Sequence, residues 1–356
     1  MDILDLRSLT NEELIEQLAP LGCPPFRARQ IRRWLDQGVT DFSRMTDLPA
    51  ALRQQLAQRY TVPGAAIERK LVSAIDGTVK YLFRLDDGET VESVLMSYRH
   101  GYSQCLSTQV GCRMGCRFCA TGMGGFVRSL SAAEMLAQIE TAQRDAGVRV
   151  SSIVLMGMGE PLDNYEQVVR FIRMLGEEGG VHIGMRHISL STCGVVPGIY
   201  RLMEEKLPIT LSVSLHAAND AARSAIMPVN RRWPITELLE ACRKYIAATG
   251  RRISFEYAMI AGVNDTDACA AELAGRLEGM LCHVNLIPVN AVAGRSQQRS
   301  SRARIQAFAA VLQKRGINVT VRRTLGADIN ASCGQLRRKA DQPVVQEDGK
   351  EAFPCR

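Results

Sequence analysis

The chain has 356 residues, of which 46% are hydrophobic and 23% charged, and its formal net charge is +7. This length allows a large core plus an accessory domain, and this composition is typical of an ordinary globular protein. The start, MDILDLRSLT, has no basic segment followed by an apolar one, and no apolar run approaches a membrane span, so we expect a cytoplasmic protein with no membrane partner.

Residues 1–62 predict a small helical domain, with helices over residues 10–22, 24–38 and 48–60. Thr10, followed three residues later by a glutamate, has the pattern of a helix N-cap. The second helix is basic, with Arg27, Arg29, Arg32 and Arg33 along it. Residues 63–100 alternate between apolar and polar positions around two Asp-Gly pairs, which predicts a β-hairpin region: a small antiparallel extension that links two domains.

Residues 101–340 predict an α/β domain in which strands alternate with helical stretches such as 131–145, 165–178 and 235–250. The strand candidates are residues 105–109, 151–157, 187–192, 209–216, 253–260, 282–289 and 317–323. Repeated β-then-α units indicate a parallel sheet covered by helices, and about six of them predict a partial (β/α)6 barrel. In such folds the active site forms at the C-terminal ends of the strands. Residues 341–356 read as a polar tail.

Basic residues are concentrated near the C-terminal end of this domain. Between Arg295 and Lys339 there are 11 lysines and arginines and one acid, Asp328, so this segment carries +10 and the rest of the chain −3. Such a block predicts either a surface for a polyanion or a solvated helix face, and the charge pattern alone does not separate the two.

Three cysteines lie within eight residues in the stretch CRMGCRFC: Cys112, Cys116 and Cys119. The chain has 11 cysteines, an odd number, and no export signal, which argues against a disulfide framework. A zinc site takes four ligands, often as two C-x2-C pairs, and no second pair exists here. An iron–sulfur cube held by three thiolates leaves one iron open for a small molecule. The open iron would then be the position at which that small molecule binds.

This spacing, after a strand and before a helix, resembles the radical S-adenosylmethionine superfamily. The resemblance implies that Cys112, Cys116 and Cys119 bind a 4Fe-4S cluster and that S-adenosylmethionine occupies the open iron. MGMGEP resembles the Gly-Glu motif of that superfamily, in which Gly159 and Glu160 would contact the amino group of S-adenosylmethionine. On its own, MGMGEP is also an ordinary turn between a strand and a helix.

Longer stretches narrow the resemblance to the RlmN family of RNA adenine methyltransferases. They are CLSTQVGCRMGCRFCATG, MGMGEPLDNY, LSVSLHAANDAARSAIMPVN, FEYAMIAGVNDT, CHVNLIPVN and VTVRRTLGADINASCGQLR. The similarity runs from about residue 10 to residue 339. It implies methylation of carbon 2 of adenosine in large-subunit ribosomal RNA at the peptidyl-transferase centre and in tRNA beside the anticodon. It also implies that residues 1–62 are an accessory RNA-binding domain.

The resemblance assigns further residues. Cys333 matches the cysteine that is methylated first, and Cys105 matches the thiol that resolves the protein–RNA adduct. Glu92 matches a position proposed as a proton acceptor, a task that the Cys105 thiol could also perform. Taken alone, Cys333 could be a surface thiol and Cys105 a buried strand cysteine. The positions that match S-adenosylmethionine contacts are Gly159, Glu160, Ser191, Ser214, Leu215, His216 and Asn290.

Carbon 2 of adenine is electron-poor and cannot attack the methyl group of S-adenosylmethionine, so a cofactor must carry the chemistry. In the implied route, Cys333 is methylated by displacement, and a deoxyadenosyl radical then takes hydrogen from that methyl group. The carbon radical adds to adenine, and a transient Cys105–Cys333 disulfide forms as the product leaves. This requires the two Cα atoms to come within roughly 4.4–6.8 Å.

Two alternatives remain open. The same machinery could act on carbon 8, as in the related Cfr-type resistance methyltransferases, although QVGC and the N-terminal helices are more similar to the carbon 2 enzymes. A non-catalytic RNA-binding protein with one zinc ion is the alternative from another class. The expected partners are ribosomal RNA, tRNA and an electron donor such as flavodoxin or ferredoxin, and the chain is expected to be a monomer.

Overall fold

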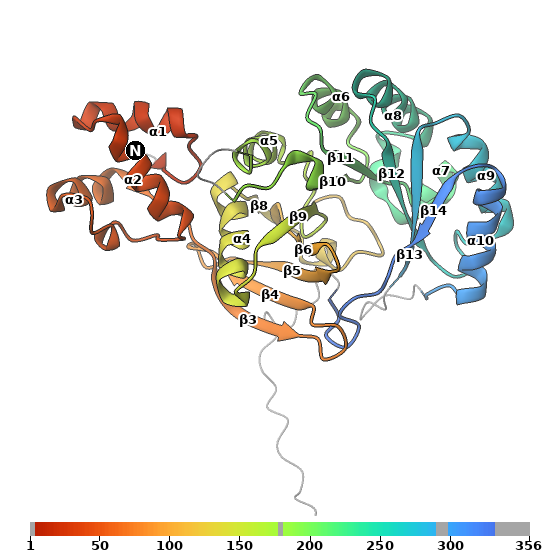
Figure 1. Cartoon of the computed structure of the whole chain (residues 1–356). Coiled ribbons are helices and arrows are strands. Elements are labelled where there is room, and N and C mark those ends of the chain that lie inside the picture. The colour runs from red at the N-terminus through yellow and green to blue at the C-terminus, as the bar shows by residue number, and fades with distance from the viewer. Residues whose placement is uncertain (1–3, 177–180, 290–297, 332–356) are drawn as a thin grey trace, which may run out of the picture.

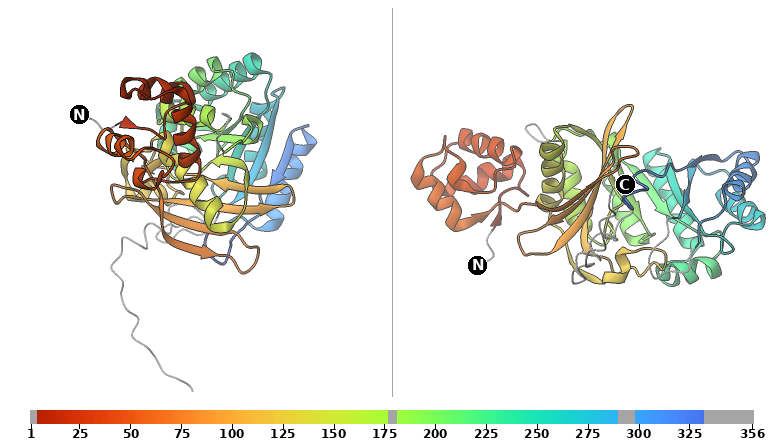
Figure 2. Two further views of the ribbon diagram at one scale, coloured as in Figure 1. Left: turned by 60° about the vertical axis from the view of Figure 1, so that its left-hand side comes forward. Right: turned by 90° about the horizontal axis from the view of Figure 1, so that it is seen from below.

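The computed structural model describes residues 4–176, 181–289 and 298–331. The N-terminal part has its own core and lies beside the rest of the molecule in two of the views (Figure 1, Figure 2). It contains α1 (Asn11–Leu18), α2 (Pro25–Asp36), α3 (Ala50–Arg59) and a parallel pair, β1 (Leu4–Asp5) with β2 (Tyr60–Thr61). The expected Thr10 cap is present: its hydroxyl accepts from the backbone N–H of Glu13, whose carboxylate accepts from Thr10 N–H.

One ten-stranded sheet organises the remainder of the chain (Figure 1). Its order is β14-β13-β12-β11-β10-β9-β6-β5-β4-β3. The antiparallel end consists of β3 (Ala66–Val72), β4 (Val79–Arg84) and β5 (Thr90–Tyr98). The parallel part consists of β6 (Gly101–Cys105), β9 (Val150–Leu155), β10 (Ile188–Thr192), β11 (Thr210–Ser214), β12 (Ile253–Met259), β13 (Cys282–Pro288) and β14 (Asn318–Val321).

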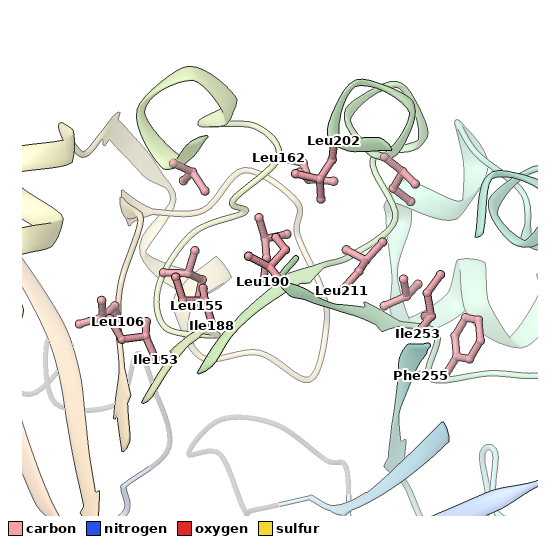
Figure 3. Packing of buried hydrophobic residues seen from close by; sticks show 14 of the residues in the cluster. Leu106, Ile153, Leu155, Leu162, Ile188, Leu190, Leu202, Leu211, Ile253 and Phe255 are labelled. Atoms are coloured by element: carbon pink, nitrogen blue, oxygen red, sulfur yellow. The ribbon is translucent and has the colours of Figure 1, made fainter. Parts of the chain in front are cut away.

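Helices cross over between successive parallel strands. They are α4 (Ala132–Ala146), α5 (Tyr165–Met174), α6 (Val196–Glu204), α8 (Ile235–Thr249), α9 (Asp267–Leu277) and α10 (Arg302–Lys314). Six β/α units followed by a last strand confirm the predicted partial barrel. Buried leucine and isoleucine side chains, among them Leu155, Leu190, Leu202 and Leu211, gather between the strands and α5 and α6 (Figure 3).

Two details differ from the sequence-based expectation. The first parallel strand is residues 101–105 rather than 105–109, because the chain leaves the sheet after Leu106, whose N–H makes its last ladder bond to Val154 O. Residues 109–111 then pair as β7 (Gln109–Gly111) with β8 (Phe126–Ser129) in a separate two-stranded sheet. The antiparallel strands are also continuous with the barrel sheet through the β5–β6 pair. In the part of the chain that the structure covers, no helix has the length and apolar character needed to cross a bilayer.

Candidate active site

A cavity of about 370 Å³ lies at the C-terminal ends of the parallel strands, where barrel folds place their active sites. Most of the predicted site residues that the structure describes line it. They are Cys105, Cys112, Cys116, Cys119, Gly159, Glu160, Ser191, Ser214 and His216. Asn290 and Cys333 lie outside the described residues. The fold therefore brings together side chains that are up to 111 residues apart in sequence, Cys105 and His216 among them.

The cysteine loop is fixed by backbone hydrogen bonds on both sides. Cys112 N–H donates to Gly125 O at 2.8 Å, and Arg117 N–H donates to Ile226 O at 2.9 Å, at the end of α7 (Asp220–Ile226). Cys112, Cys116 and Cys119 have free thiols that are partly exposed toward the cavity. Burial raises the pKa of the Cys112 thiol to about 12. A metal that binds this thiol must therefore displace its proton.

The cysteine loop suits a cluster better than a single ion. Among the described residues, no group of three or more His, Cys, Asp or Glu side chains lies close enough to hold one metal ion. In a cube each cysteine binds a different iron, so the three thiolates stand farther apart than around one zinc ion. The Thr121 hydroxyl adds a second sign of a missing partner, since it is buried, belongs to a cavity-lining residue and finds no hydrogen-bond partner in the described chain. These residues fit an iron–sulfur cluster.

Glu160 is held in place by the loops around it. Its Oε2 accepts from the Cys193 N–H at 2.7 Å and its Oε1 accepts from the Leu162 N–H at 3.1 Å. Burial raises the pKa of this carboxyl. The preceding Gly159 has a φ of +107°, and a Cβ there would lie 2.7 Å from both Thr108 Oγ1 and Gln109 Cβ. Glycine alone meets both conditions without strain, which explains why a glycine stands at this position of the turn.

His216 is a buried, neutral imidazole at the end of β11. Its Nδ1 accepts from the Ala258 N–H at 2.9 Å, so the ring proton is on Nε2 in the neutral form. Burial, with a smaller contribution from Arg223, lowers the pKa of His216 to about 3. The ring stands edge-to-face against Phe118 of the cysteine loop, with centroids 4.8 Å apart. Leu215 differs from its neighbours because its side chain packs in the core and does not line the cavity.

Cys105 ends β6 and is buried against Val94 and Met96 of β5, which also line the cavity. Leu325 and Ala331 pack against the same cluster, so the described segment after β14 approaches Cys105. The described chain just before Cys333 therefore lies near Cys105, as the expected Cys105–Cys333 disulfide requires.

Glu92 is in a different place from the other predicted residues. It does not line the cavity, is fully buried, and its Oε2 lies 2.9 Å from Lys80 Nζ, which is also buried. A proton-accepting role for Glu92 stays a prediction.

Sequence reasoning missed three residues at this site. Cys193 lines the cavity next to Glu160. Glu256 lines it from β12, and burial raises the pKa of its carboxyl. Arg223 is fully buried and donates to Cys193 O at 2.6 Å and to Ser214 O at 3.1 Å, so it joins the ends of β10 and β11. From the sequence, only the alternation of side chains along β12, which turns every second one to the inside of the barrel, could have indicated Glu256.

The basic residues are not one continuous surface. Arg322 and Arg323 are exposed and line the cavity, which brings part of the basic block to its mouth. In α2, Arg32 is buried and donates to Asn11 Oδ1 at 2.9 Å, and Arg33 pairs with Asp47 at 2.5 Å. Arg32 of this basic helix therefore faces the domain's own core and does not belong to its exposed surface.

Comparisons with known proteins show the family to which this chain belongs. The model of the radical SAM superfamily matches residues 106–273, and that of the ribosomal RNA large subunit methyltransferase N-terminal domain matches residues 4–62. The chain is 53% identical to the probable dual-specificity RNA methyltransferase RlmN of Alkaliphilus oremlandii, over 95% of this chain and 99% of that protein. It is 51% identical to the protein of the same description from Lachnoclostridium phytofermentans, over 97% of each.

A solved structure agrees as well. The crystal structure of a radical SAM methyltransferase from Sphaerobacter thermophilus superimposes with a TM-score of 0.88 at 49% sequence identity. The match covers 93% of this chain and 98% of that one. The similarity thus extends over the N-terminal helices, the antiparallel strands and the barrel together.

Proposed function

The chain belongs to the RlmN family of radical S-adenosylmethionine methyltransferases, and from that premise we propose that it methylates carbon 2 of adenosine in ribosomal RNA and in tRNA. The observation that carries the proposal is the cavity that Cys105, the three-cysteine loop and the Gly159–Glu160 turn share. The N-terminal domain match adds an RNA-related module to a radical SAM barrel. The proposed RNA sites are the peptidyl-transferase centre and the position beside the anticodon.

The family requires a 4Fe-4S cluster and S-adenosylmethionine, and the residues present fit both. Cys112, Cys116 and Cys119 would hold the cluster. When bound, this pair of cofactors supplies a 5′-deoxyadenosyl radical. The residues proposed to bind S-adenosylmethionine are Gly159, Glu160, Ser191, Ser214, Leu215, His216 and Asn290, with Leu215 limited to backbone contacts by its buried side chain.

The protein's own contribution is to fix these groups before the substrate enters. Glu160 is fixed by two backbone donors, so its carboxylate is preorganised toward an ammonium. His216 stays neutral at physiological pH because burial depresses its pKa, so its Nε2–H remains a donor without adding positive charge beside the cluster cysteines.

Two thiols carry the proposed transfer chemistry. Cys333 carries the methyl group, and Cys105 accepts the carbon 2 proton. The Cys105 sulfur then bonds to the Cys333 sulfur as the bond from Cys333 to the transferred carbon breaks, so the two thiols are oxidised and the carbon leaves on the base as a methyl group. Cys105 lines the cavity, and Ala331, two residues before position 333, packs against its cluster. A chain advances at most about 3.6 Å per residue, so a tether of two residues spans about 7 Å.

RNA would reach this site with its target base out of the stack. Arg322 and Arg323 at the mouth of the cavity are suited to phosphates on either side of such a base. We further propose that a one-electron donor such as a flavodoxin or a ferredoxin serves the cluster and that the chain acts as a monomer.

The proposed thiol roles can be tested with Cys105→Ala in the reconstituted, oxygen-free enzyme. Without the resolving thiol, the covalent link between the protein and RNA should persist, so RNA should remain attached to a peptide that contains Cys333 in mass spectrometry. Cys242→Ala is the matched control, because Cys242 is a buried thiol of α8 that does not line the cavity. Free RNA as the only species in Cys105→Ala would contradict the assignment.

A further inference from the structure

The segment Gly326–Ala331, which follows β14 and ends two residues before Cys333 in the chain, is tied to the antiparallel strands. We call it the pre-cysteine segment. Figure 1 shows it, in blue, against the orange turn between β3 and β4. The two parts are about 250 residues apart in sequence, and several hydrogen bonds join them. Such a set of long-range contacts fixes a loop that would otherwise be free to sample many conformations.

Two aspartates bind reciprocally across this contact. Asp328 accepts from Ser73 Oγ at 2.6 Å and from the Ala74 N–H at 2.8 Å. In return, Asp76 of the β3–β4 turn accepts from the Gly326 N–H at 2.9 Å. Each side therefore supplies a carboxylate to backbone or hydroxyl donors of the other, and charge-assisted hydrogen bonds of this kind are the stronger ones.

Glu92 acts on the same segment through Lys80. Lys80 Nζ lies 2.9 Å from Glu92 Oε2 and donates to the Asn330 carbonyl oxygen at 3.0 Å, with both charged side chains buried. An ammonium so deeply buried needs its carboxylate partner, because an unpaired buried charge is strongly unfavourable. The Glu92 carboxylate thus fixes the Lys80 ammonium, and Lys80 in turn binds the Asn330 carbonyl oxygen.

The backbone of the pre-cysteine segment has an unusual conformation that these contacts maintain. Asn330 has a φ of +47° and Gly326 a φ of +59°. A Cβ at Gly326 would lie 2.6 Å from the Ala331 Cβ, and the Ala331 N–H donates to Gly326 O at 3.1 Å, so the turn is closed on itself. The closed turn delivers Ala331 to the hydrophobic cluster that contains Cys105.

We propose that Glu92, Lys80, Asp76 and Asp328 are positioning residues that hold the pre-cysteine segment on β3–β5 and thereby direct Cys333 toward Cys105 and the cavity. The consequence for Cys333 rests on the proposed function. Glu92 then acts through Lys80 and needs no contact with RNA, in keeping with its complete burial away from the cavity lining. In this proposal the antiparallel strands β3–β5 support the segment that leads to the methyl-carrying thiol.

The test uses the full-length, reconstituted chain without RNA, and measures hydrogen–deuterium exchange of peptides that cover residues 324–331. Lys80→Met, Glu92→Gln and Asp328→Ala should each increase exchange of this segment at least tenfold. The double variant Lys80→Met/Glu92→Leu should be no worse than Lys80→Met alone, because the two residues act as one unit. Asp86→Ala is the matched control: Asp86 lies near the same strands and also accepts a backbone N–H, but from Gly64.

Exchange at the native rate in both Lys80→Met and Asp328→Ala would overturn the proposal. Asp328 is exposed, so its variant stays informative even if Glu92→Gln fails to fold. A second readout is the stage at which turnover stops. A positioning role predicts less methylated Cys333 and little RNA adduct, because both steps need the thiol at the cavity. An adduct that accumulates in Glu92→Gln with native exchange would instead make Glu92 the proton acceptor and overturn its place here. Failure of the native chain to methylate RNA would remove the proposed function and leave the exchange result intact.

Discussion

The carboxylate of Glu160 accepts a 2.7 Å hydrogen bond from the backbone N–H of Cys193, which joins the loop after β9 to the loop after β10. The Cys193 carbonyl in turn accepts from Arg223, whose guanidinium also reaches the end of β11. Three strand ends are thus linked at the cavity by one acidic and one basic side chain. This linkage fixes the geometry of the proposed S-adenosylmethionine site before any ligand arrives.

Glu160→Gln should weaken binding of S-adenosylmethionine at least tenfold and reduce turnover at least a hundredfold. In either orientation the new amide NH2 group would point at a backbone N–H, that of Cys193 or that of Leu162. Two hydrogen-bond donors would then face each other without an acceptor. Isothermal titration of the cluster-loaded variant with S-adenosylmethionine measures the first effect. Its iron content should equal that of the native enzyme, and affinity equal to the native value would contradict the role given to Glu160.

Replacing any one of Cys112, Cys116 and Cys119 by alanine should abolish stable cluster loading, because two thiolates cannot hold the cube against exchange with solvent thiols. Iron and sulfide analysis with the visible absorption spectrum checks this. Cys282→Ala offers the matched control, since Cys282 is a buried thiol of β13 that does not line the cavity. Full iron content in a Cys116→Ala chain would show that these thiols are not the ligands.

Neutralising Arg322 and Arg323 together by glutamine should weaken RNA binding roughly tenfold. The slope of log K against log salt should become shallower by about 1 to 2, because one to two phosphate contacts are lost. Fluorescence anisotropy of a labelled RNA hairpin over a salt series measures both quantities. Arg243→Gln, an exposed arginine of α8 away from the cavity lining, should leave them unchanged. A weaker affinity with an unchanged slope would argue for a structural effect instead.

His216 predicts a pH dependence of stability. Its folded pKa of about 3 lies below its ordinary value of 6.5, so the unfolded chain binds the extra proton between these limits. The contribution of His216 to stability is therefore complete above pH 6.5 and declines as pH falls toward 3, by at most about 1.4 kcal/mol per pH unit. His216→Asn, which tolerates the positive φ of +56°, should flatten this dependence by up to one proton. Thermal melts from pH 5 to 8 compare the two chains, and parallel curves would contradict the assignment.

Sequence reasoning succeeded where the signal is local. The Thr10 cap, the β/α alternation and the three-cysteine loop depend on neighbours in the chain, and the structure has them where the pattern predicts. The strand that ends at Cys105 was predicted four residues too late in the chain. Its bounds are set by sheet pairing with β5 and β9 and not by local propensity.

The contacts that hold the site together could not be predicted from sequence. Arg223 resembles any helix arginine, yet it is buried because three backbone carbonyls and an amide oxygen surround it. Glu92 and Lys80 lie 12 residues apart on adjacent strands, and only the register of β4 with β5 brings them together. Arg32 shows the reverse case, in which a charged residue in a basic helix points inward.

The most direct test of the account is the identity of the methylated base. The oxygen-free, reconstituted enzyme would be given a reductant, S-adenosylmethionine and unmethylated ribosomal RNA, and the digested RNA would be analysed by chromatography and mass spectrometry. The account predicts 2-methyladenosine, absent when Cys333 is replaced by alanine. 8-Methyladenosine, or 2-methyladenosine that persists in Cys333→Ala, would contradict it.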